Sequence, residues 1–321
     1  MTTHRERLQA CLAGEMPDQT PVALWRHFPV DDQSPETLAA AQIAFQRAYD
    51  FDLVKVTPAS SFCLRDWGAE DEWRGDPEGT RQYTKHVIFQ PQDWERLPLL
   101  DPTTAPHLAG QLACLRQIRA GLGPHTPMLQ TVFNPLAQAK NLASQNTLLV
   151  HLREHPDAVM EGLQTIARTT RRFVEAALDT GIDGIFYAVQ HAQATLLNED
   201  EIKHFSLSLD LQILDSSKGL WCNMLHLHGK DIYFDTCSKY PVQIINWHDR
   251  ETPPALARAR EVYQGVVCGG LSRETLVYKT AQDVRNEKEE AIRQTGGQRL
   301  IISTGCVVPV IAPHGNILAA K

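Results

Sequence analysis

The sequence contains no CxxC pair, no basic run and no apolar stretch of about 18 residues, the length that a membrane span needs. A membrane protein is therefore not expected. The seven cysteines are scattered along the chain, which predicts buried thiols in a reduced protein and not a disulfide framework. The formal net charge of −7 and the isoelectric point near 6.0 argue against a nucleic-acid partner, because such proteins carry a basic surface.

Two nucleotide-binding motifs and a sorting signal are also missing. Neither a GxGxxG turn nor a GxxxxGK[ST] loop occurs, so dinucleotide binding and P-loop phosphate binding are not indicated. We expect no covalently bound organic cofactor. Residues 3–14 predict a polar amphipathic helix without the apolar segment of a secretory signal, and a cytoplasmic protein is therefore expected.

The composition is that of a folded protein with a sizeable core: 43% of the 321 residues are hydrophobic and 21% are charged. Strand-like runs alternate with helical stretches along the chain. The strand-like runs are residues 21–29, 51–58, 127–135, 182–190, 221–228, 242–249, 266–271 and 299–304. Such alternation implies parallel pairing, and these runs predict an α/β fold with a single (β/α)8 TIM barrel domain over residues 1–321. An open, doubly wound sheet is the alternative.

Residues 59–105 are the least regular part of the chain and hold tryptophans, many acidic residues and several prolines. We expect an elaborate loop over one end of the barrel. Residues 82–89 are predicted to form one strand of a β-hairpin in this loop, and the tryptophans are predicted to attach the loop to the body. The helices expected elsewhere are residues 3–14, 34–49, 106–122, 138–153, 156–180, 199–218, 230–240, 253–262, 280–295 and 313–320.

The most informative stretch is the fifth strand-like run, which ends in His226-Leu227-His228-Gly229. Successive strand side chains point to opposite faces, so His226 and His228 share one face. Two imidazoles on one face predict half of a metal site, and zinc needs at least a third ligand. The best distant candidate is Cys306, at the end of the eighth strand. We therefore predict that His226, His228 and Cys306 bind one zinc ion.

Other polar side chains collect at the ends of the predicted strands, where the active site of such a barrel lies. They suggest a site for a small-molecule substrate, because unpaired polar groups are costly to bury. The predicted catalytic residues are Arg26, Tyr187, His248 and Asp249. The predicted substrate-binding residues are His27, Lys55, Asn134, Gln190, His191 and Asn246. A lone histidine at a strand end is more often a hydrogen-bonded structural residue, which is the alternative for His27, His191 and His248.

Three segments carry a resemblance to a known family. They are the opening helix with residues 21–26 (PVALWR), the end of the fifth strand, and residues 305–309 (GCVVP) with Pro313 and Asn316 behind them. Over nearly its whole length, the sequence resembles the uroporphyrinogen decarboxylase superfamily. The resemblance implies a (β/α)8 barrel that forms a homodimer.

That superfamily includes cofactor-free porphyrinogen decarboxylases and zinc-dependent methyltransferases that act on thiols with corrinoid partners. The methyltransferase branch binds zinc through His-x-Cys-Gly at the fifth strand and Gly-Cys near the end. His226 and Cys306 match this pattern, and His228 stands where a cysteine is expected. Because histidine also binds zinc, the resemblance implies a methyltransferase that activates a thiol, or water, at a His/His/Cys site. A corrinoid protein is the implied methyl donor or acceptor.

The decarboxylase branch matches fewer of these residues. Its first strand is followed by an Arg-x-x-x-Arg motif that grips carboxylates, and here Arg26 is followed by Val30 at the second position. A metal-free decarboxylase is nevertheless the alternative enzyme, with Arg26 as the carboxylate anchor and His226 or His248 as the proton donor. A non-catalytic barrel that binds a corrinoid or tetrapyrrole is a third possibility.

Overall fold

The computed structural model describes residues 2–321, and within them the central element is a sheet of seven strands in the order β1-β4-β5-β6-β7-β8-β9. Every neighbouring pair in this sheet is parallel. The strands are β1 (Val54–Val56), β4 (Met128–Phe133), β5 (Gly184–Val189), β6 (Met224–Leu227), β7 (Ile244–Trp247), β8 (Val266–Leu271) and β9 (Leu300–Thr304). The predicted parallel α/β barrel is thereby confirmed.

The eighth place in the barrel is taken by an extended segment and not by a regular strand. The amide of Ala23 donates to the Ile302 carbonyl (2.9 Å), and the Val22 carbonyl accepts from the amide of Asp52 (2.8 Å). The segment therefore joins β9 to the approach of β1. The prediction of a strand over residues 21–29 is wrong in extent, since only Val22 forms a ladder bridge. Pro21 has no amide donor, and Pro29 follows the point at which the chain leaves the sheet.

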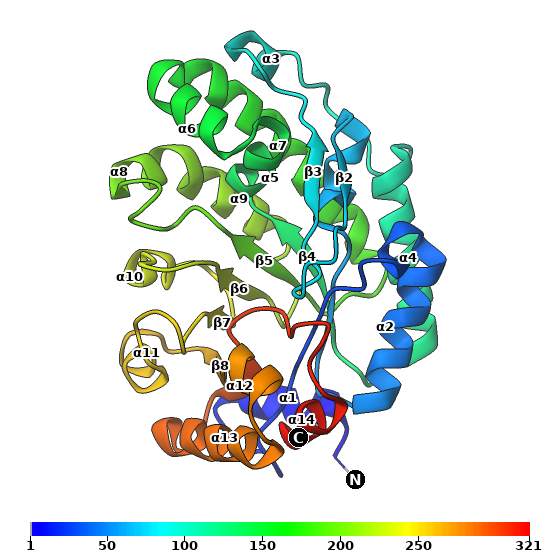
Figure 1. Ribbon diagram of the computed structural model, residues 1–321, viewed down its shortest axis with the longest axis vertical. Coiled ribbons are helices and arrows are strands. Elements are labelled where there is room, and N and C mark those ends of the chain that lie inside the picture. The colour runs from blue at the N-terminus through cyan, green and yellow to red at the C-terminus, as the bar shows by residue number, and fades with distance from the viewer. Residues whose placement is uncertain (1) are drawn as a thin grey trace.

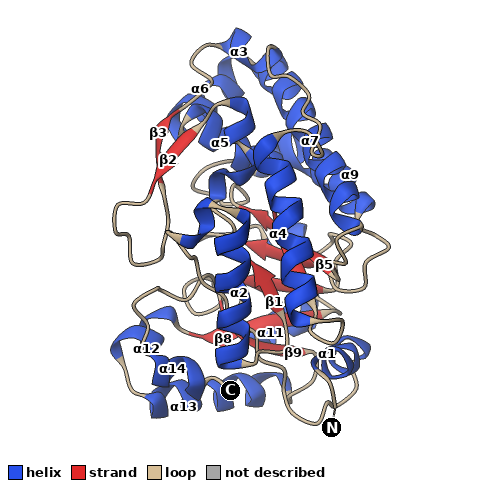
Figure 2. Cartoon of the chain, turned by 90° about the vertical axis from the view of Figure 1, so that its right-hand side faces the viewer, coloured by secondary structure: helices blue, strands red, loops and turns tan. Residues whose placement is uncertain are grey.

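Helices cover the outside of the sheet. Figure 1 shows α2 and α4 along one side of it, and Figure 2 shows the same pair side by side over the strands. Both chain ends lie at the same end of the molecule (Figure 1). The helices are α1 (His4–Ala13), α2 (Pro35–Tyr49), α3 (Pro91–Glu95), α4 (Pro106–Leu122), α5 (Pro135–Ala143), α6 (Gln145–Glu154), α7 (Pro156–Leu178), α8 (Glu199–Ile202), α9 (Ser208–Ser216), α10 (Phe234–Cys237), α11 (Leu256–Val262), α12 (Arg273–Tyr278), α13 (Ala281–Thr295) and α14 (His314–Ala319).

Several of the predicted helices are shorter or interrupted; α11, for example, begins at Leu256 and not at residue 253. The helix expected over 138–153 is divided at Ser144, whose φ of 82° no helix allows and whose hydroxyl caps α6. The helix expected over 199–218 contains a π-helical turn at Lys203–Leu207 between α8 and α9. The helix expected over 230–240 is reduced to the four residues of α10.

The apolar core has two layers because strand side chains alternate between the two sides of the barrel wall. One cluster lies inside the barrel and includes Trp25, Leu53, Phe186 and Met224. The other lies between the barrel and its helices and includes their sequence neighbours on the opposite face. The strands are buried on both faces, as expected for a parallel sheet covered by helices.

The irregular stretch 59–105 is built around a short hairpin of β2 (Glu70–Glu72) and β3 (Gln82–Lys85). The predicted hairpin strand over 82–89 is therefore confirmed in its first half. Trp94 in α3 is completely buried, and its Nε1 donates to Nδ1 of His151 in α6 at 3.0 Å. Trp67 is buried too and donates to the Pro98 carbonyl at 2.9 Å. The contact of Trp94 with His151 attaches the loop to the body, as predicted, whereas the Trp67 bond joins two residues of the loop itself.

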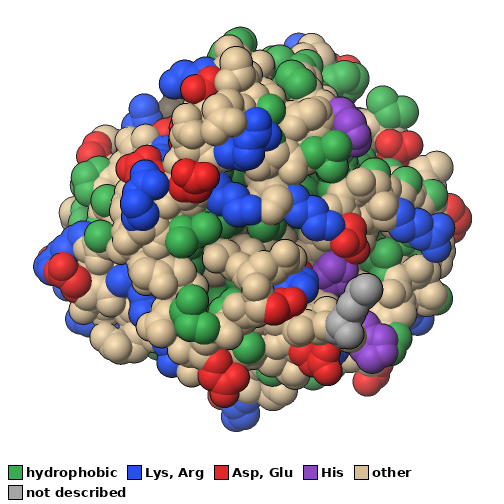
Figure 3. Space-filling view, turned by 90° about the horizontal axis from the view of Figure 1, so that it is seen from below, with side chains coloured by type: hydrophobic (Ala, Val, Ile, Leu, Met, Phe, Trp, Pro, Cys, Tyr) green, Lys and Arg blue, Asp and Glu red, His purple; other side chains and the backbone are tan. Residues whose placement is uncertain are grey.

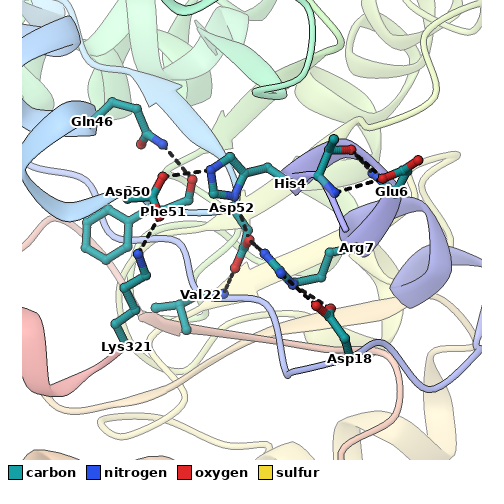
Figure 4. Close-up of polar contacts among 11 residues, drawn as sticks. His4, Glu6, Arg7, Asp18, Val22, Gln46, Asp50, Phe51, Asp52 and Lys321 are labelled. Atoms are coloured by element: carbon teal, nitrogen blue, oxygen red, sulfur yellow. Dashed lines mark hydrogen bonds and ion pairs between the residues drawn. The ribbon is translucent and has the colours of Figure 1, made fainter. Parts of the chain in front are cut away.

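An ion-pair network joins α1 to the approach of β1 and to the C-terminus (Figure 4). His4 contacts Asp52 through Nδ1 and Asp50 through Nε2, both at 2.9 Å. Arg7 pairs with Asp52 at 2.5 Å, and Lys321 pairs with Asp50 at 2.6 Å. The network holds α1 across the end of the barrel opposite the strand carboxyl ends, where Leu8 belongs to the inner core cluster.

The network predicts a pH-dependent stability. The contact with Asp52 raises the pKa of His4 above 6.5, despite the opposing effect of burial. Its stabilising contribution is therefore complete below pH 6.5 and is lost as the pH rises through the raised pKa. We expect His4→Ala to lower the free energy of unfolding by about 1 kcal/mol at pH 6 and by less at pH 9. Urea unfolding at both pH values checks this, with the exposed His204→Ala as control; equal losses at both values contradict it.

The described side chains on the face seen from below form no single large patch of one charge. Figure 3 shows acidic and basic side chains interspersed over this face. Among the described residues, no helix combines the length and the apolar character that crossing a bilayer requires.

Candidate metal centre

Four donor side chains meet at the carboxyl ends of the central strands. They are His226 in β6, His228 just after it, His248 just after β7, and Cys306 after β9. Their ligand atoms all lie within 4.8 Å of one another, and Cys306 Sγ is 3.9 Å from His228 Nδ1. The structure thus brings together the three predicted metal ligands, and it adds His248 to the group.

His226 is held in one orientation by Asn246 on the neighbouring strand. The Asn246 side-chain amide donates to the carbonyls of Cys268 (2.8 Å) and Thr304 (3.0 Å), so its Oδ1 is left to accept. This oxygen lies 2.6 Å from His226 Nδ1, which must therefore carry the proton. Nε2 of His226 is then the lone-pair nitrogen, as in metal-binding histidines whose other nitrogen is hydrogen-bonded.

His248 supplies an unpartnered buried nitrogen to the same group. Its Nδ1 lies 3.5 Å from Glu251 Oε2, while its Nε2 is buried and has no hydrogen-bond partner among the described residues. A buried polar atom without a partner is costly and points to a functional role. Together with the imidazole and thiol donors beside it, this atom makes the group chemically suited to zinc.

The electrostatic surroundings favour the protonation states that metal binding requires. Burial lowers the pKa of His226 well below its ordinary value and that of His228 to about 4, so both rings are neutral at pH 7. Burial alone would raise the pKa of the Cys306 thiol, but the contact with His248 and the charge of Arg273 outweigh it, and the pKa is lowered. Neutral imidazole and thiolate are the metal-binding forms.

A cavity of about 670 Å³ opens beside the donor group. Trp25, Phe186 and Val307 give it apolar walls near Cys306. Residues 78–83, from the hairpin of the irregular stretch, form part of its cover. The cavity has the size and the mixed lining of a small-molecule site.

The structure places most of the predicted substrate-binding residues at this cavity. His27, Lys55, Gln190 and His191 line it. Asn246 lies behind His226, so it orients a donor and does not form the wall. Strand side chains alternate between the two faces, so a residue two positions from a member of the inner core cluster also faces inward. His27 follows Trp25 in this way, and Lys55 follows Leu53.

Four predicted residues point away from the cavity, which corrects their assignment. The Tyr187 hydroxyl donates to Asp210 in α9 at 2.6 Å, among the helices. Asn134 caps α5, and Asp249 accepts from the amide of Gly270 at 3.0 Å. The guanidinium of Arg26 lies over the rings of Phe28 and Phe45, with 5.2 and 5.4 Å to their centroids. All four stand on the outward face of their segments, next to an inward-facing residue.

Other residues that line the cavity were not predicted from the sequence. Lys140 of α5 and Gln145 of α6 form part of one wall, and Glu78 and Arg81 come from the hairpin. No strand carries them, so an inventory of strand ends could not find them. Polar residues at the start and end of the helices after each strand were the available signal.

Removal of the Asn246 amide is expected to weaken metal binding although Asn246 is not a ligand. In Asn246→Ala, His226 loses the acceptor that fixes its tautomer, and zinc affinity should fall by about 10–100-fold. Chelator competition measures this affinity. Gln243→Ala is the matched control, because Gln243 lies just before the start of the same strand and accepts from the backbone amide of Asn223 (2.8 Å), away from the donor group. Equal zinc affinity in Asn246→Ala and wild type contradicts the orienting role.

The fold and the site define a (β/α)8 barrel with a His/Cys donor group at the carboxyl ends of its strands. The chain belongs to the uroporphyrinogen decarboxylase (URO-D) family, whose sequence profile matches residues 3–320. No curated protein matches the sequence at a significant level.

Solved structures confirm the fold. A methyltransferase from Methanosarcina mazei superposes with a TM-score of 0.87 at 19% identity, covering 100% of this chain and 97% of the other. A B12-independent methionine synthase from Shewanella sp. W3-18-1, in complex with selenomethionine, gives a TM-score of 0.58 at 14% identity, covering 94% of this chain and 91% of the other. At these identities, the likeness shows the fold alone.

Proposed function

We propose that this chain is a zinc-dependent methyltransferase that activates a thiol at His226, His228 and Cys306. The observation that carries the proposal is the group of four donor atoms within 4.8 Å, because His226, His228 and Cys306 of this group line a cavity large enough for a small molecule. Family membership and the methyltransferase of the same fold support it.

His226 Nε2, His228 and Cys306 Sγ would hold the ion. When bound, zinc lowers the pKa of a thiol or water at its open coordination position and so supplies a nucleophile near neutral pH. Asn246 keeps Nε2 of His226 directed at the site, and the apolar walls at Trp25 and Phe186 limit access of water.

His248 would act on the substrate proton. A ring nitrogen of His248 lies within 4.8 Å of a donor atom of each of the other three residues, its Nε2 has no partner among residues 2–321, and we propose that Nε2 accepts the proton of an incoming thiol. The substrate sulfur then forms a bond to the methyl carbon as the bond from that carbon to its donor breaks, and the bonding pair stays with the donor. A corrinoid protein is the donor that we propose.

The decarboxylase alternative loses its carboxylate anchor. It required Arg26 to hold a substrate carboxylate, and the Arg26 side chain lies against aromatic rings outside the cavity. The non-catalytic alternative predicts a spectral change of an added corrinoid without turnover.

The first test is metal content followed by a transfer assay. We expect about one zinc ion per chain by elemental mass spectrometry of the purified protein. With methylcobalamin and a thiol, we expect loss of the methylcobalamin absorbance and formation of the thioether. A protein that neither contains zinc after purification nor takes it up on addition would refute the proposal.

A further inference from the structure

One guanidinium joins the cover of the cavity to the turn that carries His248. Arg273, the first residue of α12, pairs with Glu78 in the hairpin that covers the cavity and with Glu251 in the turn after β7. Nη2 and Nε of Arg273 both donate to Oε1 of Glu251, at 2.6 and 3.1 Å. The Arg273 side chain is only 15% exposed, so salt screens these ion pairs less than it screens pairs on the open surface.

The position of Arg273 is fixed by the helix that it begins. The Ser272 hydroxyl caps α12 by accepting from the amide of Thr275, and the amide of Ser272 donates to Glu287 of α13 at 2.9 Å. The Thr275 hydroxyl donates to the other oxygen of the same carboxylate at 2.7 Å. The start of α12 is therefore tied to α13, and Arg273 reaches its two acidic partners from an anchored helix.

Glu251 directs its second carboxylate oxygen at His248. Oε2 lies 3.5 Å from Nδ1 of His248, and the amide of Glu251 donates to the His248 carbonyl at 2.8 Å, so a tight turn keeps the two side chains together. Burial alone would raise the pKa of Glu251, but the contact with Arg273 outweighs it, and the pKa is lowered. An ionised carboxylate only accepts hydrogen bonds. In the neutral ring of His248, Nδ1 therefore carries the proton and Nε2 the lone pair.

The tip of the cover is held at the mouth of the barrel by two further contacts. The Pro77 carbonyl accepts from the amide of Val310, in the segment after β9, at 2.7 Å. The φ of Gly79 is 78°, and a Cβ added there would lie 2.5 Å from Cβ of His27, so glycine permits a close approach of the tip. Glu78 stands between Pro77 and Gly79, and the seated tip therefore delivers its carboxylate to the guanidinium.

We propose that Glu78, Arg273 and Glu251 couple closure of the cover to the orientation of His248, so that the ring is set for catalysis when the tip is seated over the cavity. The coupling follows from sharing, because one guanidinium serves both carboxylates and loss of either partner frees it to turn toward the other. Arg273 and Glu251 act through His248 and are positioning residues. The inference rests on the proposed function for the role of His248 and adds the residues that set its ring.

The first test reads the ring of His248 directly and needs neither a thiol nor a methyl donor. In purified protein with 15N-labelled histidine at about pH 8, above the ordinary pKa of histidine, NMR shows which ring nitrogen carries the proton. His248→Gln identifies the signals of His248 by their loss. The tautomer with the proton on Nε2 should amount to less than about 10% in wild type and to about half in Glu251→Ala.

The same measurement tests the coupling to the cover. Glu78→Ala should speed amide hydrogen exchange of residues 76–80, because the tip loses its ion pair, and should raise the fraction of the Nε2-protonated ring of His248. Glu261→Ala is the matched control, since Glu261 pairs with Arg258 on the open surface and should behave as wild type in both measurements. Circular dichroism checks that each variant is folded.

The second test is the transfer assay on the zinc-loaded protein. Glu251→Ala should lower kcat by about 10–100-fold, with KM for the thiol and the zinc content unchanged, because it removes only the partner that orients His248. Glu251→Gln keeps an oxygen that accepts from Nδ1 and should recover most of the loss. Glu78→Ala should lower kcat in the same direction and by less.

Each part of the inference has a result that overturns it. A wild-type ring protonated at Nε2, or a tautomer ratio or kcat in Glu251→Ala equal to wild type, overturns the positioning role. Exchange of residues 76–80 or a tautomer ratio in Glu78→Ala equal to wild type overturns the coupling. If no protein shows transfer, the proposed function fails, and the NMR and exchange measurements still decide whether the cover and the ring of His248 are coupled.

Discussion

Replacement of Cys306 by alanine is expected to abolish stoichiometric zinc binding and, with it, methyl transfer. Cys306 is the one sulfur donor in the group, and it enters from a segment that no other donor shares. Zinc affinity should fall by more than about 100-fold, because changes beyond the ligands already cost about 10–100-fold. Elemental mass spectrometry after dialysis measures the loss. Retention of about one zinc per chain in this variant would remove Cys306 from the site.

Three further variants test whether the loss of zinc is specific to the predicted ligands. Cys114→Ala removes a fully buried thiol in α4 and should leave the zinc content unchanged. His226→Ala should lose zinc as Cys306→Ala does. His248→Ala should retain zinc and lose transfer activity by about 10²–10⁴-fold, the usual contribution of a general base. Loss of zinc from His248→Ala would instead show that His248 is a fourth zinc ligand.

Replacement of Trp94 by alanine is expected to cost about 3–5 kcal/mol of unfolding free energy, as for other buried aromatic residues. Trp94 is completely buried and packs against α7 at Gly162, where an added Cβ would lie 2.7 Å from its ring. The substitution also removes the hydrogen bond to His151. Urea unfolding measures the stability, and limited proteolysis should show earlier cleavage within residues 59–105.

Trp73→Ala is the matched control for this prediction. Trp73 lies in the same stretch, is only half-buried, and donates to the nearby Asp76 carbonyl at 3.1 Å. We expect a loss of about 1 kcal/mol or less, since that contact is local. Similar losses in the two variants would show that Trp94 does not attach the stretch to the body in the way we describe.

The errors in the predicted site follow one physical rule. Polar residues at the strand ends were all predicted to belong to the site, but strand side chains alternate between the barrel interior and the helix layer. His27, Lys55, Gln190 and His226 face inward, whereas Arg26, Asn134, Tyr187 and Asp249 face outward. A residue at an even spacing from an apolar residue of the inner cluster faces inward, and a residue at an odd spacing faces outward. Which apolar residues form the inner cluster is known only once the barrel has closed.

The role of Asn246 illustrates a second limit. Its position on the inward face was predictable, but its function depends on contacts with three other strands: His226 in β6, Cys268 in β8 and Thr304 in β9. Those neighbours are 20, 22 and 58 residues away in the chain. A hydrogen-bond direction that depends on such separated groups has no local signature.

The sequence by itself determined the alternation of strands and helices, the shared face of His226 and His228, and the family. These are local properties, because side-chain direction repeats every two residues along a strand and a family motif is read along the chain. Tertiary structure decided the rest: closure of the barrel by residues 21–25, the arrival of His248 and Cys306 beside the histidine pair, and the wall of Lys140, His191 and Gln145. Each of these features requires segments distant in sequence to be packed together, and the distances between those segments depend on the whole barrel.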